Sequence, residues 1–421
     1  MAVPHDARPF ADALERAYHD GLRADDACLR ALELVTLERG SDASKNLLTE
    51  LRSLLEGNLQ GFELPPMHLV IARANVEKLA ELTHAKRLTR IRASNKLRGP
   101  AIGEALLERA RAALPADPKE SGSWAECAVR AMTYSDTEER READHITVCL
   151  ARGLAFWGNS LRVLCDLRGA EKLIRQADDT LEFFGIGNLA ARAELASFRG
   201  SLQRARRDFE EAILSLELAE AGWNLLGDLG QQARVCLKIS HTHGLADRPQ
   251  DALEAVRSGI PLLERLDDPR LAWSFRHNEA WFLEGTGLAG ESRQAADAAR
   301  QLAAEFPDSF TQLRVQWLEG RLCRSEGRPD EAVDHFRAVQ TGFLADQNPY
   351  DAALVSLDLA TLYLETGRHT EVVELATAMR AAFEALGVHR EALAAWRLFT
   401  DACQRQAANV QLAKNLARYL D

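Results

Sequence analysis

The chain has 421 residues, 46% of them hydrophobic and 27% charged, which is typical of a protein with ample apolar surface to bury. Its formal net charge of -11 at pH 7 argues against general binding to nucleic acid or anionic membranes. The sequence shows neither a signal peptide nor the roughly 20 apolar residues of a membrane helix. We therefore expect a cytoplasmic protein with no membrane partner.

Residues 1–99 are predicted to be helical but without a regular repeat. The stretches 10–22, 27–40 and 46–57 each fit an amphipathic helix, and 61–67 is predicted to be a loop. We interpret this region as a helical cap or a small separate domain.

A basic segment closes the N-terminal region, HAKRLTRIRASNKLRGP at 84–100, and it contains no acidic residue. Its cations are Lys86, Arg87, Arg90, Arg92, Lys96 and Arg98. One hypothesis is contact with the phosphate backbone of DNA or RNA, where Lys and Arg release counterions. The alternative is a solvated helix face or a patch that docks on the acidic remainder of the chain, which is favoured because stacking aromatic residues are missing.

From residue 100 onward the sequence repeats with a period of forty. One series of positions holds small residues: Gly200, Ser240, Ala280, Gly320 and Ala360. Twelve residues after each come Ala212, Ala252, Ser292, Ala332 and Val372. Seven residues after each come Arg207, Asp247, Gly287, Gly327 and Gly367. A fixed period of this length predicts a stack of helical hairpins.

The physical reason for the pattern is that two helices must cross closely and turn sharply. Small residues, one on each helix, allow the close crossing. Gly ends the first helix because it tolerates a left-handed C-terminal cap, and Pro249 and Pro329 suit the first turn of the second helix. We find no strand pattern, so the predicted fold is all-α, a solenoid of antiparallel helix pairs.

The predicted repeats occupy residues 100–407. Their starts lie near Ala101, Glu142, Asn188, Leu229, Pro269, Ser309, Pro349 and His389. Residues 408–421 are predicted to form a C-terminal capping helix. Because solenoid ends expose apolar faces unless they are capped, this helix could also support a homo-oligomer.

The pattern resembles the tetratricopeptide repeat family. The stretch WGNSLRVLCDLRGAEKLIRQA carries the family's positions as Gly158, Leu161, Ala170, Ile174 and Ala177. The period of forty resembles the longer-repeat variants of bacterial signalling and regulatory proteins. The resemblance implies a right-handed superhelix whose first helices line a concave, partner-binding groove.

The groove positions that the resemblance implies are rich in Arg and Trp. The candidate partner-binding residues are Arg152, Asn159, Arg162, Arg204, Arg234, His241, His277, Trp281, Arg314, Trp317, Arg321 and Arg324. Ser197 shares these positions, which become apolar at Leu354, Leu357 and Leu364. Arg matches carboxylates with a rigid fork, and Arg with Trp is typical of binding hot spots. We expect an acidic or carboxylate-bearing protein or peptide, and the alternative is that these Arg pair internally and the Trp are buried.

No nucleotide, serine-hydrolase or zinc-protease motif occurs, so we expect no catalytic residue, no cofactor and no enzyme. His145 and Cys149 are one helical turn apart, but the next turn offers Arg152, and two ligands are too few for a structural zinc. His241 and His243 face different ways on a helix. No metal site is therefore expected.

The seven cysteines form no C-x-x-C pair. They are Cys28, Cys127, Cys149, Cys165, Cys236, Cys323 and Cys403. An odd number at wide spacing predicts buried free thiols.

The resulting hypothesis is a non-catalytic scaffold, an adaptor or regulator in a bacterial complex, that holds its partner in the Arg- and Trp-lined groove. The alternative is a nucleic-acid-linked regulator that uses the basic segment 84–98 and senses a peptide with its repeats.

Overall fold

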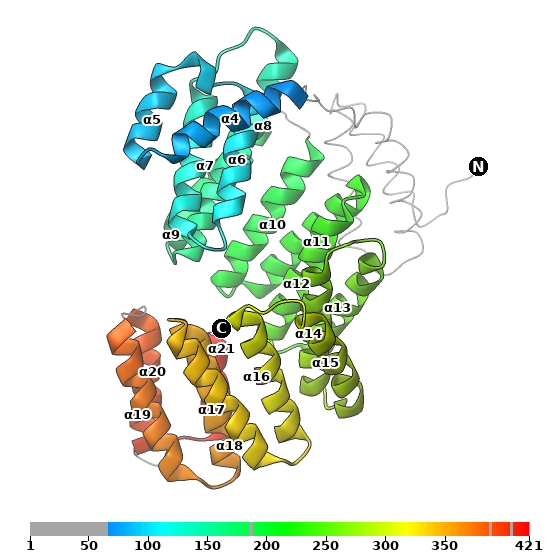
Figure 1. Cartoon of the computed structure of the whole chain (residues 1–421), viewed down its shortest axis with the longest axis vertical. Helices are drawn as coiled ribbons and strands as arrows, with labels where there is room; N and C mark the ends of the chain where they lie inside the picture. Colours follow the sequence, from blue (N-terminus) through cyan, green and yellow to red (C-terminus); the bar gives the residue numbers. More distant parts are fainter. Residues whose placement is uncertain (1–65, 185–187, 387–389, 405–406, 421) are drawn as a thin grey trace, which may run out of the picture. The chain divides into compact units, whose positions relative to one another are not determined.

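The computed structural model describes residues 66–184, 188–386, 390–404 and 407–420 (Figure 1). Within these ranges all regular structure is helical. The helices are α4 (Pro66–Ala80), α5 (His84–Ala93), the short 3-10 helix η2 (Asn95–Leu97), α6 (Pro100–Ala113), α7 (Pro118–Thr133), α8 (Arg140–Val163), α9 (Leu167–Phe183), α10 (Leu189–Ala205), α11 (Phe209–Leu226), α12 (Leu229–Leu245), α13 (Pro249–Leu263), α14 (Pro269–Gly285), α15 (Ala289–Ala303), α16 (Ser309–Ser325), α17 (Pro329–Ala345), α18 (Pro349–Glu365), α19 (His369–Leu386), α20 (Arg390–Gln404) and α21 (Val410–Leu420).

The chain divides into two compact units, Met1–Thr242 and His243–Asp421. In each unit successive helices pack against one another as pairs, and the first helices of neighbouring pairs also touch, as α8 touches α10 and α14 touches α16. This arrangement confirms the predicted all-α solenoid of antiparallel helix pairs.

The first helices begin close to where the sequence predicts, because a short polar side chain caps each start. Asp268, Asp308 and Asn348 each accept a hydrogen bond from the backbone N–H three residues on. Such caps satisfy a helix-terminal donor and contribute about 1 kcal/mol each. The helices that follow begin at Pro269, Ser309 and Pro349.

The turn inside each pair places one residue in the left-handed region. The position is Cys165, Arg207, Asp247, Gly287, Gly327 or Gly367, with φ between 62° and 80°. At the turn of α16 and α17, the N–H groups of Gly327 and Arg328 donate to carbonyls at the end of α16, which closes the helix as a left-handed cap does. Three turns hold Gly and three hold a residue that pays a steric penalty there.

The small residues of the repeat allow the helices of a pair to cross closely. A Cβ atom on Gly200 would lie 2.9 Å from the carbonyl oxygen of Ala212, and one on Gly320 would lie 2.7 Å from the ring of Phe336. Both separations are shorter than van der Waals contact, so the predicted role of these positions is confirmed.

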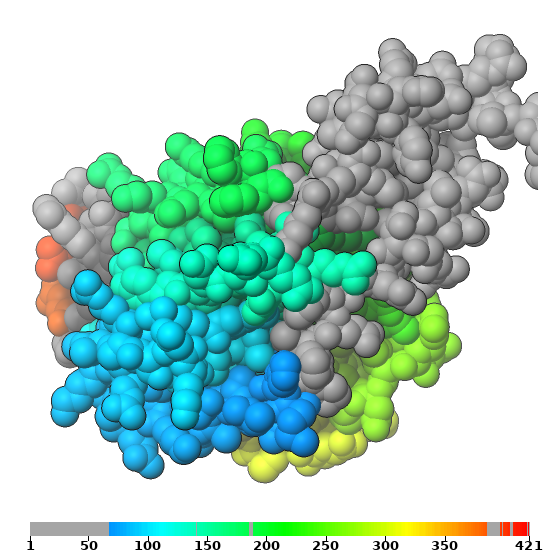
Figure 2. Space-filling model, turned by 90° about the horizontal axis from the view of Figure 1, so that it is seen from above, coloured from blue at the N-terminus to red at the C-terminus, as the bar shows by residue number. Residues whose placement is uncertain are grey.

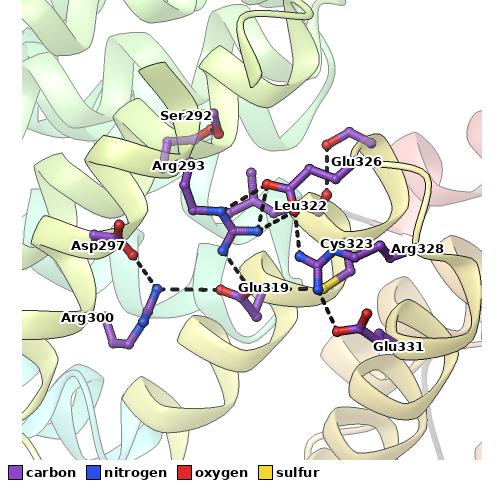
Figure 3. A network of polar contacts seen from close by, with 12 residues as sticks. Ser292, Arg293, Asp297, Arg300, Glu319, Leu322, Cys323, Glu326, Arg328 and Glu331 are labelled. Carbon is purple, nitrogen blue, oxygen red and sulfur yellow. Dashed lines mark hydrogen bonds and ion pairs between the residues drawn. The ribbon is translucent and has the colours of Figure 1, made fainter. Parts of the chain in front are cut away.

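Ion pairs also join neighbouring helix pairs in the second unit (Figure 3). Arg293 of α15 donates to Glu319 of α16 at 2.6 Å and to Glu326, which follows α16, at 2.8 Å. Arg328 contacts Glu326 and Glu331, so the network continues onto α17. These carboxylates hold α15, α16 and α17 in one register.

At the N-terminal side α4 already begins at Pro66, so the last two residues of the predicted loop at 61–67 are helical instead. Proline suits the first turn of a helix because its missing N–H has no partner there anyway. The three amphipathic helices predicted before residue 60 lie outside the described residues. Figure 2 shows the surface of α4 and α5 in blue, beside the cyan surface of α6 and α7.

At the C-terminal side α21 packs against α18 and α20, and Ala413 and Leu416 are buried there. Arg418 also pairs with Asp247 at 2.9 Å. The predicted role of residues 408–421 as a capping helix stays a prediction.

Six cysteines are free thiols in the described part of the chain, and five of them are buried. Cys165 is exposed, contrary to the expectation of buried thiols, because it occupies a hairpin turn. None of the described helices is both long and apolar enough to cross a bilayer.

Candidate functional site

A cluster of cations lies in the first unit, where α8, α10 and α12 run as successive first helices. Arg162 of α8, Arg204 of α10 and Lys238 of α12 act on one another electrostatically. We call these three residues the cation cluster. The groove positions implied by the sequence include the two arginines but not Lys238.

Fixed hydrogen bonds position the cluster. The Nε–H of Arg162 donates to Oδ1 of Asn159 at 2.9 Å, and Asn159 is buried with 4% exposure. The Lys238 ammonium donates to the Ser197 hydroxyl at 2.7 Å and lies 5.8 Å from the ring of Phe198. These partners are neutral, so they orient the cations without cancelling their charge.

The electrostatics of the cluster are unfavourable to its charges. Burial and the repulsion of Arg204 lower the pKa of Arg162 to about 10. Burial, followed by Arg204 and Arg162, lowers the pKa of Lys238 to about 7, and Glu194 partly opposes this. Among the described residues no carboxylate lies within ion-pair distance of Arg162 or Lys238. Arg162 and Lys238 are therefore cations without a carboxylate partner among the described residues.

Arg152, also predicted to face the groove, is instead held by carboxylates. It contacts Glu104 of α6 at 2.7 Å and Glu194 of α10 at 2.7 Å, and Arg111 binds Glu194 from the other side at 2.8 Å. Although burial opposes it, Glu194 and Glu104 raise the pKa of Arg152. Arg152 is a structural cross-link between three helices, as the internal-pairing alternative describes.

In the second unit the structure brings the predicted Trp and Arg residues together, but their polar groups are already satisfied. Trp317 is buried with 3% exposure, and its Nε1–H donates to Asp358 at 2.7 Å. Its ring meets that of Trp281 edge to face, with centroids 5.2 Å apart. Arg321 lies 3.9 Å from the Trp281 ring and donates to Glu284.

The remaining predicted residues of this unit are paired or buried in the same way. Arg324 binds Glu365 at 2.7 Å. The guanidinium of Arg314 lies 4.9 Å from the Trp317 ring centroid. His277 is 2% exposed, and burial, with Arg314, lowers its pKa to about 3. In the second unit, therefore, contacts within the chain occupy the residues that the sequence analysis assigned to a partner.

On α12 the predicted residues Arg234 and His241 flank Lys238. Arg234 is exposed and His241 is half-buried. Lys238 itself was missed because it stands outside the family's groove positions. A signal was nevertheless present, since Lys238 is the single charged residue in the apolar stretch Val235–Ile239. Lysine is seldom buried among apolar residues unless it is paired.

The basic segment 84–98 divides into buried and exposed members. Arg87 is 6% exposed, donates to Glu120 at 2.6 Å and lies 3.8 Å from the Trp124 ring centroid. Arg98 donates to the backbone carbonyl of Arg92. The exposed side chains are Lys86, Arg90, Arg92 and Lys96. Arg87 is thus part of the fold, and four cations remain open to solvent.

One group of three metal-donor side chains occurs in the described part of the chain. Glu104, His145 and Cys149 place their donor atoms within 4.8 Å of one another.

These features define a class of protein, an all-α solenoid of helix pairs in which cations from successive first helices lie close together. No protein-family model matches the chain, and no curated protein matches its sequence. Membership of the tetratricopeptide repeat family therefore stays a prediction.

Among solved structures the fold is similar to that of two Rap proteins. A Rap protein complexed with Competence and Sporulation Factor aligns with a TM-score of 0.58 at 12% identity, covering 76% of this chain and 88% of that chain. The apo form of RapI aligns with a TM-score of 0.52 at 10% identity, covering 76% and 86%. At these identities the likeness concerns the fold alone.

Proposed function

We propose that this protein is a non-catalytic regulator or adaptor that binds an acidic or carboxylate-bearing segment of a partner protein at the cation cluster. The observation that carries the proposal is the gathering of Arg162, Arg204 and Lys238 from three successive helices without a matching carboxylate on Arg162 or Lys238. Such an arrangement costs folding energy, and stability is commonly given up at sites that serve binding.

The cation cluster suits a carboxylate better than a single cation would. Asn159 fixes the orientation of Arg162 through its Nε–H, so the two outer nitrogens of the guanidinium form the fork that a carboxylate binds bidentately. Lys238 adds a compact donor. An incoming carboxylate would relieve the repulsion among the three cations, and this relief adds to the hydrogen bonds formed.

The comparison supports a role in binding another molecule. The Rap protein of similar fold was solved in complex with Competence and Sporulation Factor. That complex shows that a solenoid of this kind can hold a separate factor, and we carry over to this chain the mode of action, not the factor itself.

A direct test measures binding of fluorescent peptides by anisotropy. The probes are an Asp- and Glu-rich peptide with a free C-terminus and a matched Asn- and Gln-rich peptide with an amidated one. The proteins are wild type and the variant Arg162→Gln, Lys238→Gln, with Arg175→Gln as a control because Arg175 is 69% exposed on α9. Loss of buried charge contacts costs about 2–5 kcal/mol, so the double variant should bind the acidic peptide at least about 30-fold more weakly. Equal binding by wild type and double variant, or equal binding of both peptides, would overturn the proposal.

A second candidate function rests on a separate observation, the four exposed cations of α5 and η2. No acidic residue occurs in the segment 84–98, and Lys86, Arg90 and Arg92 are exposed on α5. Nucleic-acid binding there would weaken steeply with salt. The test compares wild type with a variant in which these three residues are Gln, and it measures binding of random-sequence duplex DNA and single-stranded RNA. Arg87 is left intact because it holds the fold. The variant should bind more weakly than wild type. No binding by wild type at low salt would end this candidate.

A further inference from the structure

The sequence places His145 and Cys149 one turn apart on α8 and offers no third ligand nearby. The fold supplies one from α6, which lies against α8. Oε1 of Glu104 lies 3.4 Å from Sγ of Cys149 and 3.5 Å from Nε2 of His145. A carboxylate, an imidazole and a thiol from two helices therefore converge on one point.

We propose that Glu104, His145 and Cys149 form a binding site for one Zn²⁺ ion. Zinc bonds of 2.0–2.3 Å in tetrahedral geometry imply distances of about 3.3–3.6 Å between neighbouring ligand atoms. The two distances from Glu104 agree with this requirement, and the ligand atoms of His145 and Cys149 lie within 4.8 Å of each other. The fourth position is left to water or to a donor from a bound molecule, as in zinc sites with three protein ligands.

The donor set selects the class of metal. A thiolate and an imidazole suit Zn²⁺ and similar transition metals, whereas Mg²⁺ and Ca²⁺ are bound by oxygen ligands. Cys149 is fully buried, and the His145 and Glu104 side chains are 17% and 22% exposed. The thiol and Nε2 of His145 are both buried from solvent, so the ligand atoms lie inside the packing of α6 and α8.

The packing of α6 on α8 is what brings the ligands together. Gly103 stands beside Glu104, and a Cβ atom on Gly103 would lie 3.1 Å from Cβ of Cys149 and 2.9 Å from Sδ of Met132. The absence of a side chain at Gly103 therefore lets the helices approach closely at the level of the three ligands.

Arg152 is the feature that most opposes a cation here, since it binds both oxygens of Glu104. Its charge is already matched by Glu194 at 2.7 Å, so the added repulsion is limited. When Oε1 binds the ion, Oε2 can keep Arg152, which then orients the ligating carboxylate as outer-shell partners do.

The test uses the full chain after treatment with a chelator and titrates it with Co²⁺, a spectroscopic substitute for Zn²⁺. We expect about one ion per chain, a thiolate-to-cobalt charge-transfer band and the visible bands of four-coordinate cobalt, all displaced by Zn²⁺. Cys149→Ser should abolish the charge-transfer band, and Cys165→Ser, which removes the exposed thiol of the hairpin turn, should leave it unchanged. Zn²⁺ should also raise the unfolding temperature of wild type.

Glu104→Gln tests the third ligand, because its amide keeps the size of the side chain. We expect it to weaken Zn²⁺, measured by competition with a chromophoric chelator, by more than the 10–100-fold that loss of an outer-shell partner costs. Circular dichroism of each variant shows whether it is folded. The proposal is wrong if folded wild type gives no charge-transfer band, if the band survives in Cys149→Ser, or if it is lost in Cys165→Ser.

Discussion

Replacing Lys238 by Met should make the fold more stable while it weakens binding of an acidic peptide. Met keeps a long apolar side chain and removes the charge. Burial and the two arginines lower the pKa of Lys238 from 10.5 to about 7, and each pKa unit corresponds to about 1.4 kcal/mol. Since the side chain is only partly buried, we expect Lys238→Met to raise the free energy of unfolding at pH 7 by roughly 2–4 kcal/mol.

The sign of the pH dependence follows from the direction of the shift. The pKa of Lys238 is lower in the folded chain than in the unfolded chain, so between about pH 7 and pH 10 the unfolded chain binds more protons. The stability of wild type therefore rises with pH across this window. The advantage of the variant should be full below about pH 7 and should fade toward about pH 10.

The assay is urea unfolding followed by circular dichroism at several pH values across that window. Lys172→Met is the matched control, because Lys172 is exposed on α9 and a surface change of this kind stays within about 0.5 kcal/mol. The peptide-binding assay is then repeated with both variants. A variant less stable than wild type at pH 7, or a difference that does not change with pH, would refute the electrostatic reasoning.

Three further outcomes follow from the packing. Arg321→Leu should lower the free energy of unfolding by about 2–4 kcal/mol, because it leaves the poorly exposed Glu284 without its partner; urea unfolding measures this loss, and unchanged stability would contradict the pairing. Arg87→Met should cost about 2–3 kcal/mol while Arg90→Met stays within about 0.5 kcal/mol, and equal effects in the same assay would mean that Arg87 is not held as described. Cys165→Gly should raise the unfolding temperature, since it relieves about 1 kcal/mol of steric strain at φ 62°, and a lower temperature would rule that out.

The repeat was predictable from the sequence because its causes are local. Small residues at the crossings, a left-handed residue at each hairpin turn and short polar caps act within one pair of helices. The turn position could be located at Arg207 and Asp247 even without glycine, since the period of forty fixes it. Local rules of this kind need no knowledge of the neighbouring helix pairs.

The candidate site was predictable only in part, because its chemistry depends on neighbouring pairs. The sequence indicated that Arg321 and Trp317 share a surface, but it did not reveal that Glu284 and Asp358 occupy their polar groups. These partners lie 37 and 41 residues away. Lys238 was missed because it stands outside the groove positions that the resemblance implies. Only its apolar neighbours in the sequence distinguish it.

Residues that pair between successive first helices share a common spacing in the sequence, and the cation cluster has the same spacing. Side chains on successive first helices meet when they stand about one repeat apart, as Arg324 meets Glu365 at 41 residues and Arg152 meets Glu194 at 42. Arg162 and Arg204 are also 42 residues apart. In the other two pairs an acidic residue stands opposite the arginine, whereas Arg204 stands opposite Arg162.

Arg204→Glu would restore the common pattern at this step. Compared with a neutral Gln at this position, the attraction should raise the free energy of unfolding by about 1–2 kcal/mol, and the new carboxylate should occupy Arg162 and exclude an acidic peptide. Arg204→Gln separates the two effects, because it removes the repulsion without supplying a competitor. Stability should therefore be higher in Arg204→Glu than in Arg204→Gln, while peptide affinity should be lower. If Arg204→Glu were less stable than Arg204→Gln, Arg162 would not face this position, and the cation cluster would lose its structural basis.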